Sequence, residues 1–493
     1  MLHDVPENYQ DLKGAFLNAL QEIEHLREQL RLKQRQRFGP SSESTLHPGM
    51  KPLFDEISKE ENDDKPQVNK KKLTIKGHER VIVRRELPKG LAREEVYCDL
   101  SDEDKVCPCC SESMVKVTEK SSEKLHVKPA VFIVKKFITP VYGCKKCEEV
   151  KQARMPFHPI PKCQVSFESL AHIAVCKFAD GLPLKRIEGI FAREGIDIKR
   201  DRMSRWMIQF SKVLKPIYEA LQRRLLSGPC FGIDETTFQT LKEAGRQAHQ
   251  KSFFIVQARE GPPGQNITLF HYRKSRSKET IAPLIGDFKG QIISDGLGVY
   301  DSLFSEYPGI AHGGCWSHAR RKFVEAMKGK KSKKDSIAGK MLMHINRLFD
   351  IEREIQAKNL AKASHRQQYS KPTVDKIDEL LKKSILVVPK KSLTGQALHY
   401  LNNQWNRLIA FLTYDLLPIH NNFVERSIRP VAVGRKAFLF ADTTDGAECA
   451  AILYSLISTA KSNGLNPMTY LCRVTEGLGK GLVLEELLPI TKA

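Results

Sequence analysis

The first strongly periodic segment of the chain spans residues 8–37. Its apolar side chains recur at alternating spacings of four and three residues, at Leu12, Phe16, Ala19, Ile23, Leu26 and Leu30. This is the a/d seam of about three heptads and predicts a helix. We favour a short oligomerising coiled coil, because polar residues flank the seam; an amphipathic helix packed on its own domain is the alternative. Residues 43–75 are polar, rich in Lys, Glu and Asp, and are expected to form a largely disordered linker.

Residues 76–160 are expected to form a β-rich module that binds zinc. Short strand-like runs lie at 80–85, 125–127 and 130–142. Two C-x-x-C pairs, Cys107 with Cys110 and Cys144 with Cys147, each form a tight turn that points two sulfurs at one ion. Two such turns together give a tetrahedral Cys₄ site for structural Zn²⁺. A redox dithiol is the alternative, and Cys109 is expected to be a bystander.

Residues 165–227 have a helical pattern. One predicted helix ends near Glu194 and Gly195, and another starts near Lys199 with Met203, Trp206 and Phe210 on one face. Helix, short glycine turn and helix are typical of a helix-turn-helix, although a plain helical hairpin has the same pattern. The start of the second helix is basic and is expected to contact phosphates and base edges of DNA. The residues concerned are Lys199, Arg200, Arg202 and Arg205.

From residue 228 the pattern changes to short apolar runs. Strands are predicted at 230–234, 252–258, 266–272, 291–294 and 310–312, with helices at 277–285 and from 317. The order β-β-β-α-β-α-β-α is that of a ribonuclease-H-like fold, in which the first and fourth strands are neighbours. The expected fold class is therefore multidomain α/β, with a ribonuclease-H-like catalytic core at 228–440. A helical insertion at 331–415 interrupts this core, and a C-terminal helical region follows at 441–493.

Three carboxylates are the candidate catalytic residues. Asp234 and Asp295 each end one of the two neighbouring strands, and together they place two carboxylates at one sheet edge. Alone, each would more often be a turn former. Such oxygen ligands hold Mg²⁺ or Mn²⁺, and two ions about 4 Å apart support phosphoryl transfer. Glu425 is the third candidate, on a short helix capped by Asn421 or Asn422 and ending near Pro430; a surface ion pair with Arg429 is the alternative.

Basic and amide side chains accompany these carboxylates. Those expected to bind DNA are His318, Arg320, Arg321, Asn422, Arg426, Arg429, Arg435 and Lys436. A metal-ligand role for His318 is the less favoured reading. In the insertion, one helix face carries Leu342, Ile345, Leu348, Ile351 and Ile355. The basic run at 330–334 fits a DNA-contacting loop and a solvated loop equally well.

Composition narrows the class of partner. The 493 residues include 80 Lys and Arg against 58 Asp and Glu, a net charge of +22, which points to nucleic acid or another polyanion. The 12 cysteines are mostly scattered, which is unlike a secreted disulfide framework and indicates a reducing compartment. No apolar run is long enough to span a bilayer, and the N-terminus has no signal-peptide pattern. A cytoplasmic protein without a membrane partner is expected.

Several separate blocks of sequence resemble the DDE transposases of the insertion sequence family sixty-six. They are Gly232-Ile233-Asp234-Glu235-Thr236, Ser294-Asp295-Gly296, the run from Gly314 to Phe323, the run from Asn421 to Pro430, and Gly434-Arg435-Lys436. The resemblance covers roughly residues 12–485. It implies that Asp234, Asp295 and Glu425 are the DDE triad, which nicks transposon ends and joins the freed 3′-hydroxyl to target DNA. It also implies a homo-oligomer, double-stranded DNA as partner, and possible small accessory proteins.

Two other functions are compatible with the pattern. The chain could be a catalytically silent DNA-binding regulator derived from a transposase, but the triad is intact. It could be another nuclease of the same fold, such as a Holliday-junction resolvase. The N-terminal zipper, zinc module and helix-turn-helix disfavour that class, because junction enzymes read shape and need no such modules.

Overall fold

The computed structural model describes most of the chain from residue 132 onward and selected parts before it. The described residues are 70–75, 78–83, 132–143, 150–152, 155–328 and 336–491, with Phe16, Ala19, Ile23, Leu26, Arg27, Leu30 and Cys109. The chain divides into two compact units, Gly39–Lys136 and the remainder, Met1–Phe38 with Phe137–Ala493. In the smaller unit, β1 (Lys70–Ile75) and β2 (His78–Val83) form an antiparallel hairpin.

The N-terminal expectations are met in part. All described positions between 16 and 30 are helical, and the apolar side chains there are exposed: Phe16 62%, Ile23 46%, Leu26 58% and Leu30 59%. The predicted linker 43–75 was wrong at its end, because residues 70–75 form β1. The rest of that linker, and the predicted strand at 125–127, lie outside the described residues.

The predicted strand at 130–142 was wrong over most of its length. Residues 132–140 have no regular structure, and only β3 (Val141–Gly143) is a strand, paired with β4 (Val150–Gln152). The apolar side chains of this stretch are exposed; Ile133 and Val134 keep 72% and 96% of their surface. Strand propensity depends on packing against a partner face, which these side chains do not have.

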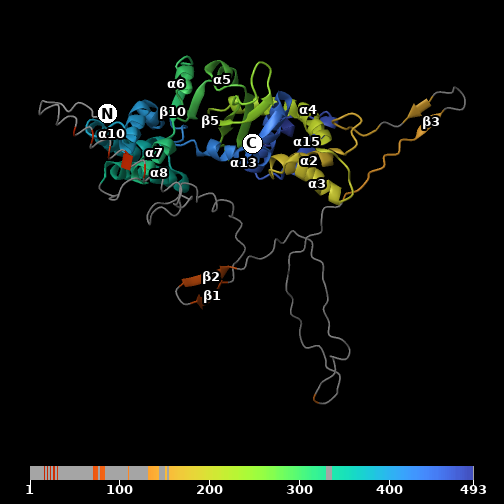
Figure 1. Cartoon of the computed structure of the whole chain (residues 1–493), viewed down its shortest axis with the longest axis horizontal. Helices are drawn as coiled ribbons and strands as arrows, with labels where there is room; N and C mark the ends of the chain where they lie inside the picture. The colour runs from red at the N-terminus through yellow and green to blue at the C-terminus, as the bar shows by residue number, and fades with distance from the viewer. Residues whose placement is uncertain are drawn as a thin grey trace, which may run out of the picture. The chain divides into compact units, whose positions relative to one another are not determined.

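A five-stranded mixed sheet forms the centre of the larger unit (Figure 1). Its strands are β5 (Cys230–Thr237), β7 (Phe253–Arg259), β8 (Ile267–Arg273), β9 (Gly290–Ser294) and β10 (Ile310–Gly314). The order is β10-β9-β5-β7-β8. The first three strands in sequence are antiparallel, whereas β9 and β10 run parallel to β5. All five predicted strands are present, and the first and fourth are neighbours as expected.

Helices surround this sheet. Three precede it, α2 (Phe167–Phe178), α3 (Leu184–Arg193) and α4 (Arg200–Leu226). Between and after the later strands come α5 (Lys278–Ile285), α6 (Gly298–Phe304) and α7 (Trp316–Lys328). The C-terminal part holds α13 (Asn422–Phe438), α14 (Thr444–Ser462), α15 (Pro467–Gly479) and the short η5 (Leu484–Leu487). A small parallel pair, β6 (Gln239–Lys242) with β11 (Phe440–Thr443), was not predicted.

The described part of the predicted insertion at 331–415 is mainly helical, as expected. It comprises α8 (Ile337–Lys358), α9 (Lys362–His365), η3 (Arg366–Ser370), α10 (Lys371–Ile385), α11 (Leu393–Asn403), α12 (Trp405–Ile409) and η4 (Ala410–Leu412). The predicted apolar face of α8 is buried from Leu342 to Ile355. In Figure 1, α7, α8 and α10 gather beside the sheet. The basic run at 330–334 lies outside the described residues.

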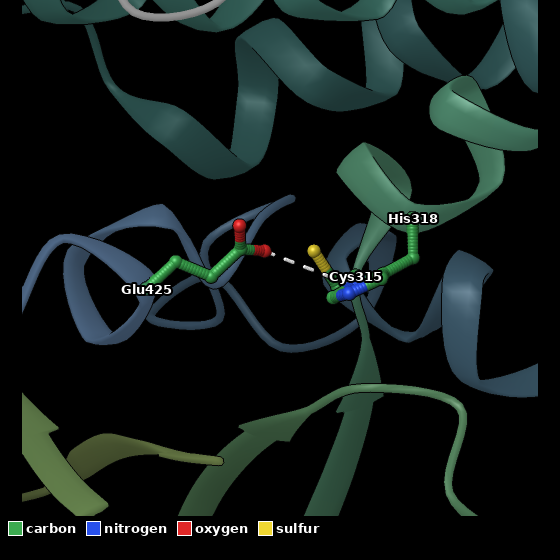
Figure 2. Close-up of side chains that lie close together, drawn as sticks. All are labelled: Cys315, His318 and Glu425. Carbon is green, nitrogen blue, oxygen red and sulfur yellow. Dashed lines mark ion pairs between the residues drawn. The ribbon is translucent and has the colours of Figure 1, made fainter. Parts of the chain in front are cut away.

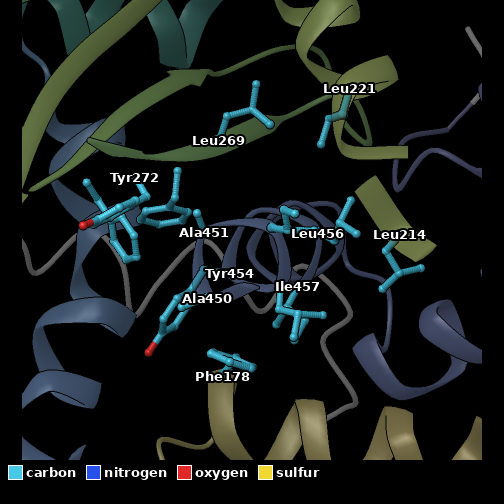
Figure 3. Packing of buried hydrophobic residues seen from close by; sticks show 14 of the residues in the cluster. Phe178, Leu214, Leu221, Leu269, Tyr272, Ala450, Ala451, Tyr454, Leu456 and Ile457 are labelled. Atoms are coloured by element: carbon cyan, nitrogen blue, oxygen red, sulfur yellow. The ribbon is translucent and has the colours of Figure 1, made fainter. Parts of the chain in front are cut away.

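Helix α14 is buried on nearly all sides and covers the edge strand β8 (Figure 3). Its hydroxyls replace a missing neighbouring strand. Ser455 Oγ accepts the backbone N–H of Phe270 at 2.8 Å, and Thr459 Oγ1 accepts that of Thr268 at 3.0 Å. Thr459 also donates to the Thr268 carbonyl oxygen at 3.0 Å. An edge strand exposes backbone groups that must be paired or covered, and α14 does both.

One hydrophobic cluster joins α2, α4, the sheet, α14 and α15. It runs across the expected boundaries at 227/228 and 440/441, so the helices on either side share their core with the sheet. The N-cap of α14 is Thr443, whose hydroxyl oxygen accepts the backbone N–H of Gly446 at 3.2 Å. No described helix is long and apolar enough to cross a membrane.

Candidate active site

Asp234 and Asp295 lie on neighbouring parallel strands in the same register. The β5–β9 pairing ends with Gly232 opposite Ile293, and each aspartate lies two residues further along the chain, Asp234 within β5 and Asp295 just after β9. Asp295 follows the end of β9, as predicted. The prediction that the first strand also ends at its aspartate was wrong: β5 continues to Thr237, because β7 still pairs with it on the other side. The two carboxylates nevertheless come from one edge of the β5–β9 ladder.

The electrostatics of Asp234 link all three predicted carboxylates. Burial raises the pKa of Asp234 well above 3.8, and the charges of Asp295, Glu235 and Glu425 raise it further. The backbone N–H of Glu235, 2.7 Å from Asp234 Oδ1, opposes this shift. Clustered carboxyl groups favour the ionised form when a divalent cation lies among them. An all-oxygen donor set of this kind fits Mg²⁺ or Mn²⁺.

Glu425 lies in the first turn of α13, which is fixed directly to β5. The side-chain amide of Asn421 donates to the carbonyl oxygen of Ile233 at 3.0 Å. Gly232 allows this close approach, because a Cβ there would overlap Asn421 Oδ1 and Val424 Cγ2. Strand β5 and the start of α13 therefore place Asp234 and Glu425 on adjoining elements.

The predicted shape of the Glu425 helix was wrong in two respects. Asn421 occupies the N-cap position, but its side chain bonds to β5 and makes no cap. The helix also continues through Pro430 to Phe438. A proline inside a helix removes one backbone hydrogen bond. Here the residues beyond it, Val431 and Gly434, are buried, and their packing holds the helical conformation.

The start of α7 brings a second group of side chains to Glu425 (Figure 2). Arg321 Nη2 lies 3.2 Å from Glu425 Oε2, and His318 Nδ1 lies 3.8 Å from Glu425 Oε1. Cys315, just before the helix, accepts the backbone N–H of Asn421 at 3.2 Å from its Sγ. Among the described residues, one ligand atom each from Cys315, His318 and Glu425 lies within 4.8 Å of the other two.

Burial controls the protonation of this group. It raises the pKa of the Cys315 thiol to about 11 and lowers that of His318, against the opposing charge of Glu425. His318 was predicted to lie near the triad, whereas Cys315 was missed as a site residue. Its signal was present in the C-x-x-H spacing with His318, which a search for paired cysteines passes over.

Two further side chains at the site were not predicted. Glu235 is held by Arg276 Nη1 at 2.9 Å and by the Tyr300 hydroxyl at 3.0 Å. Burial and then Asp295 raise the pKa of Glu235, while Arg276 and Tyr300 lower it. On the other side, Tyr400 of α11 lies against Gly296, where a Cβ would be 2.7 Å from its hydroxyl. The helical insertion therefore forms part of the wall around Asp295.

Several residues expected to face DNA have partners inside the protein. Arg320 is 7% exposed, and its Nε donates to Asn346 Oδ1 of α8 at 2.8 Å. Asn422 is 6% exposed and accepts from Ser317 Oγ at 2.9 Å. Arg435 bonds to the carbonyl and hydroxyl oxygens of Thr237. In this structure these side chains join elements around the site.

Other basic positions remain accessible. Arg429 and Lys436 are exposed on α13, and Arg426 is half-buried with Glu260 3.6 Å away. In the helical region, Gly195 adopts a left-handed φ of 76° between α3 and α4, as the turn requires. The four basic residues at the start of α4 are all exposed: Lys199, Arg200, Arg202 and Arg205. The cysteines Cys107, Cys110, Cys144 and Cys147 lie outside the described residues.

Comparison with known proteins identifies the family. The family model described as Transposase IS66 family matches residues 162–449, which include the sheet, α7 and the start of α14. The chain belongs to the IS66 transposase family. A second match, the zinc-finger binding domain of transposase IS66, covers residues 104–148, and a third, Transposase C of IS166 homeodomain, covers residues 25–96. Membership of the IS66 family indicates a role in transposition, and the second match supports a structural Zn²⁺ in the segment with the paired cysteines.

Relatives of this IS66 family chain occur in Sinorhizobium fredii (strain NBRC 101917 / NGR234). Uncharacterized protein y4jD is 32% identical over 82% of this chain and 81% of its own length. Uncharacterized protein y4qI is 30% identical over 77% of this chain and 72% of its own length. These similarities extend over most of the chain.

Proposed function

We propose that this IS66 family protein is an active DNA transposase, which cuts DNA at the ends of its element and joins them to target DNA. One observation carries the proposal: Asp234 and Asp295 each lie two residues beyond the last pair of two parallel strands, and Glu425 raises the pKa of Asp234 from an adjoining helix. The strand order β10-β9-β5-β7-β8 supports a ribonuclease-H-like core. Asp234, Asp295 and Glu425 would be the catalytic carboxylates.

The proposed chemistry needs two divalent cations, Mg²⁺ or Mn²⁺, held by these three side chains. When bound, such ions activate the attacking oxygen and stabilise the leaving oxygen of a phosphodiester. The protein's own contribution is to position the carboxylates. The Glu235 N–H orients Asp234, and the backbone N–H of Leu297 donates to Asp295 Oδ1 at 3.0 Å. Arg321 holds one oxygen of Glu425. No Ser or Tyr nucleophile is required.

DNA binding is assigned to several surfaces. The exposed basic start of α4 would act as the recognition helix of a helix-turn-helix, and the accessible Arg429 and Lys436 would meet phosphates near Glu425. We assign the structural Zn²⁺ to Cys107, Cys110, Cys144 and Cys147, all within the zinc-finger match. The exposed apolar side chains between Phe16 and Leu30 support pairing with a second copy through a coiled coil. Small accessory proteins would be further partners.

A direct test is metal-dependent nicking of DNA that carries the element's own ends, with wild type and Asp295→Asn. We expect nicking by wild type in Mg²⁺ or Mn²⁺, and binding without nicking by the variant. Nicking by Asp295→Asn at the wild-type rate would contradict the proposal. A catalytically silent regulator would bind the ends and nick in neither form. We do not favour it, because the effect of Asp295 and Glu425 on the pKa of Asp234 supports a site shared by the three carboxylates.

A further inference from the structure

The cluster formed by Cys315, His318 and Glu425 differs in chemistry from the three-carboxylate centre beside it. The carboxylates offer only oxygen, whereas this cluster offers one sulfur, one imidazole nitrogen and one oxygen. We propose that Cys315, His318 and Glu425 form a second metal site, specific for Zn²⁺ over Mg²⁺, that withdraws Glu425 from the catalytic ions when it is filled. This inference rests on the proposed function, because it assigns Glu425 to both sites.

The spacing of the ligand atoms fits a zinc ion. One atom from each residue lies within 4.8 Å of the other two. Zinc bonds of about 2.0–2.3 Å at tetrahedral angles place ligand atoms roughly 3.3–3.8 Å apart. A bound ion would therefore draw the three side chains closer together than they lie in this structure. A water molecule would complete the four ligands.

Two buried polar atoms of the cluster residues lack a hydrogen-bond partner. They are His318 Nδ1 and Glu425 Oε1. They face each other at 3.8 Å, which is longer than a hydrogen bond (Figure 2). Buried polar atoms in folded proteins nearly always have a hydrogen-bond partner. Two such atoms without a partner, close to a thiol, suggest that all three groups share one bound partner. A cation between them satisfies both atoms.

The third ligand, Cys315, lies where a metal-bound thiolate is stabilised. It directly precedes α7, and the Asn421 backbone N–H donates to its Sγ at 3.2 Å. Burial raises the pKa of the free thiol to about 11, so the thiolate would form only with a bound cation; the helix start and the backbone N–H donor oppose the effect of burial and favour the thiolate. The C-x-x-H spacing places Cys315 and His318 on the same first turn of this helix. Thiolate and imidazole together favour Zn²⁺, while Mg²⁺ requires oxygen ligands.

With this site filled, both oxygens of Glu425 would be engaged, one by the metal ion and one by Arg321. Oε1 faces the cluster, and Oε2 is paired with Arg321 at 3.2 Å. Among the described residues, the group of potential metal ligands that contains Glu425 includes neither Asp234 nor Asp295. A zinc ion would stabilise this orientation, and Glu425 would no longer be free to complete the carboxylate centre. The site would therefore inhibit the enzyme.

Counting bound zinc tests the site without any activity assay. Full-length protein with its zinc module loaded is titrated with Zn²⁺ against a chromophoric chelator. We expect wild type to bind one more tight equivalent than Cys315→Ser or His318→Asn. Cys163→Ser, which changes a partly exposed thiol outside the cluster, should keep the wild-type number. Two ligand variants are used so that the test still holds if Cys315→Ser, a change at a buried position, does not fold. Thermal unfolding shows whether each variant is folded. Equal zinc numbers in wild type and a folded ligand variant would overturn the proposal.

Competition for Glu425 is tested by the electron paramagnetic resonance of Mn²⁺. Added to the Mn²⁺-bound protein, the extra Zn²⁺ should release Mn²⁺ from wild type and from Cys163→Ser, and release none from His318→Asn. Zinc that binds to wild type without releasing Mn²⁺ would overturn the inhibitory role. Neither measurement needs DNA cleavage. If the protein binds the extra zinc but never nicks DNA, the transposase assignment fails while the metal site stands.

Discussion

The side-chain amide of Asn421 donates a hydrogen bond to the backbone carbonyl of Ile233, 3.0 Å away. This bond joins the start of α13 to the strand that carries Asp234. The backbone N–H of Asn421 points the other way, to Cys315 Sγ. One residue thus connects β5, α13 and the start of α7, the elements that carry Asp234, Glu425 and His318. The geometry of the proposed centre depends on this junction.

Substitution of Gly232 should disturb that junction. A Cβ there would overlap Asn421 Oδ1 and Val424 Cγ2, so Gly232→Ala should destabilise the protein by about 1–3 kcal/mol, as overpacking of a core does. The matched control is Gly189→Ala in α3, where a Cβ meets nothing within 4 Å. Alanine in a helix should stabilise that variant by about 0.5–1 kcal/mol. Urea unfolding measures both changes. Equal effects of the two substitutions would contradict a close contact between Gly232 and the start of α13.

Asp234→Asn should stabilise the metal-free protein at neutral pH. The folded-state pKa of Asp234 is raised above its usual 3.8, so between about pH 4 and that raised value the folded protein holds a proton that the unfolded chain releases. The unfolding free energy of wild type should therefore fall as pH rises through this window. The unfolding free energy of Asp234→Asn should lack this contribution to the fall. Urea unfolding at pH 5 and pH 8 measures the difference.

Mn²⁺ should reverse the order of stability of wild type and Asp234→Asn. Mn²⁺ should raise the melting temperature of wild type and leave that of Asp234→Asn nearly unchanged. Asp287→Asn, at an exposed position, should follow wild type under all conditions. An Asp234→Asn variant that gains as much stability from Mn²⁺ as wild type would show that Asp234 is no metal ligand.

Thr459→Val should cost about 1–3 kcal/mol of unfolding free energy. The substitution leaves the N–H and the carbonyl of Thr268 without the hydroxyl that pairs them, and both lie on a buried edge strand. Thr475→Val is the control, because its buried hydroxyl only donates to the Leu471 carbonyl within α15. Urea unfolding of the two variants should show the larger loss for Thr459→Val. A similar loss in both would mean that α14 is held by apolar packing alone.

Cys107→Ser should release the structural zinc ion. The expected reason is loss of one of four thiolates in a closed tetrahedral site. Elemental analysis of purified protein should find one zinc fewer than in wild type, whereas Cys109→Ser should retain it. Retention of zinc by Cys107→Ser, or its loss from Cys109→Ser, would show that the ligands are assigned incorrectly.

The central sheet could be predicted because its strands contain short apolar runs bounded by turn residues. Phe254, Ile255 and Val256 are fully buried, since helices cover both faces of the sheet, and burial on both faces removes polar alternation. The strand order then brought Asp234 and Asp295 together without further information. The amphipathic face of α8 could be predicted for a similar reason.

What could not be predicted depends on contacts between distant residues. Tyr400 approaches Gly296 from the helical insertion, and no local pattern marks this contact. The length of α13 depends on the burial of Val431 and Gly434, which outweighs the local effect of Pro430. The burial of Arg320 depends on Asn346 of another helix. In each case the deciding partner lies outside the local segment that the pattern describes.

The most direct test of the central claim is a cleavage and strand-transfer assay on DNA with the element's own ends, in Mg²⁺ or Mn²⁺. It compares wild type, Glu425→Gln, and Glu476→Gln as an exposed control on α15. We predict that wild type and Glu476→Gln nick and join the ends, while Glu425→Gln binds the same DNA and does neither. Strand transfer by Glu425→Gln at the level of wild type would contradict the three-carboxylate centre.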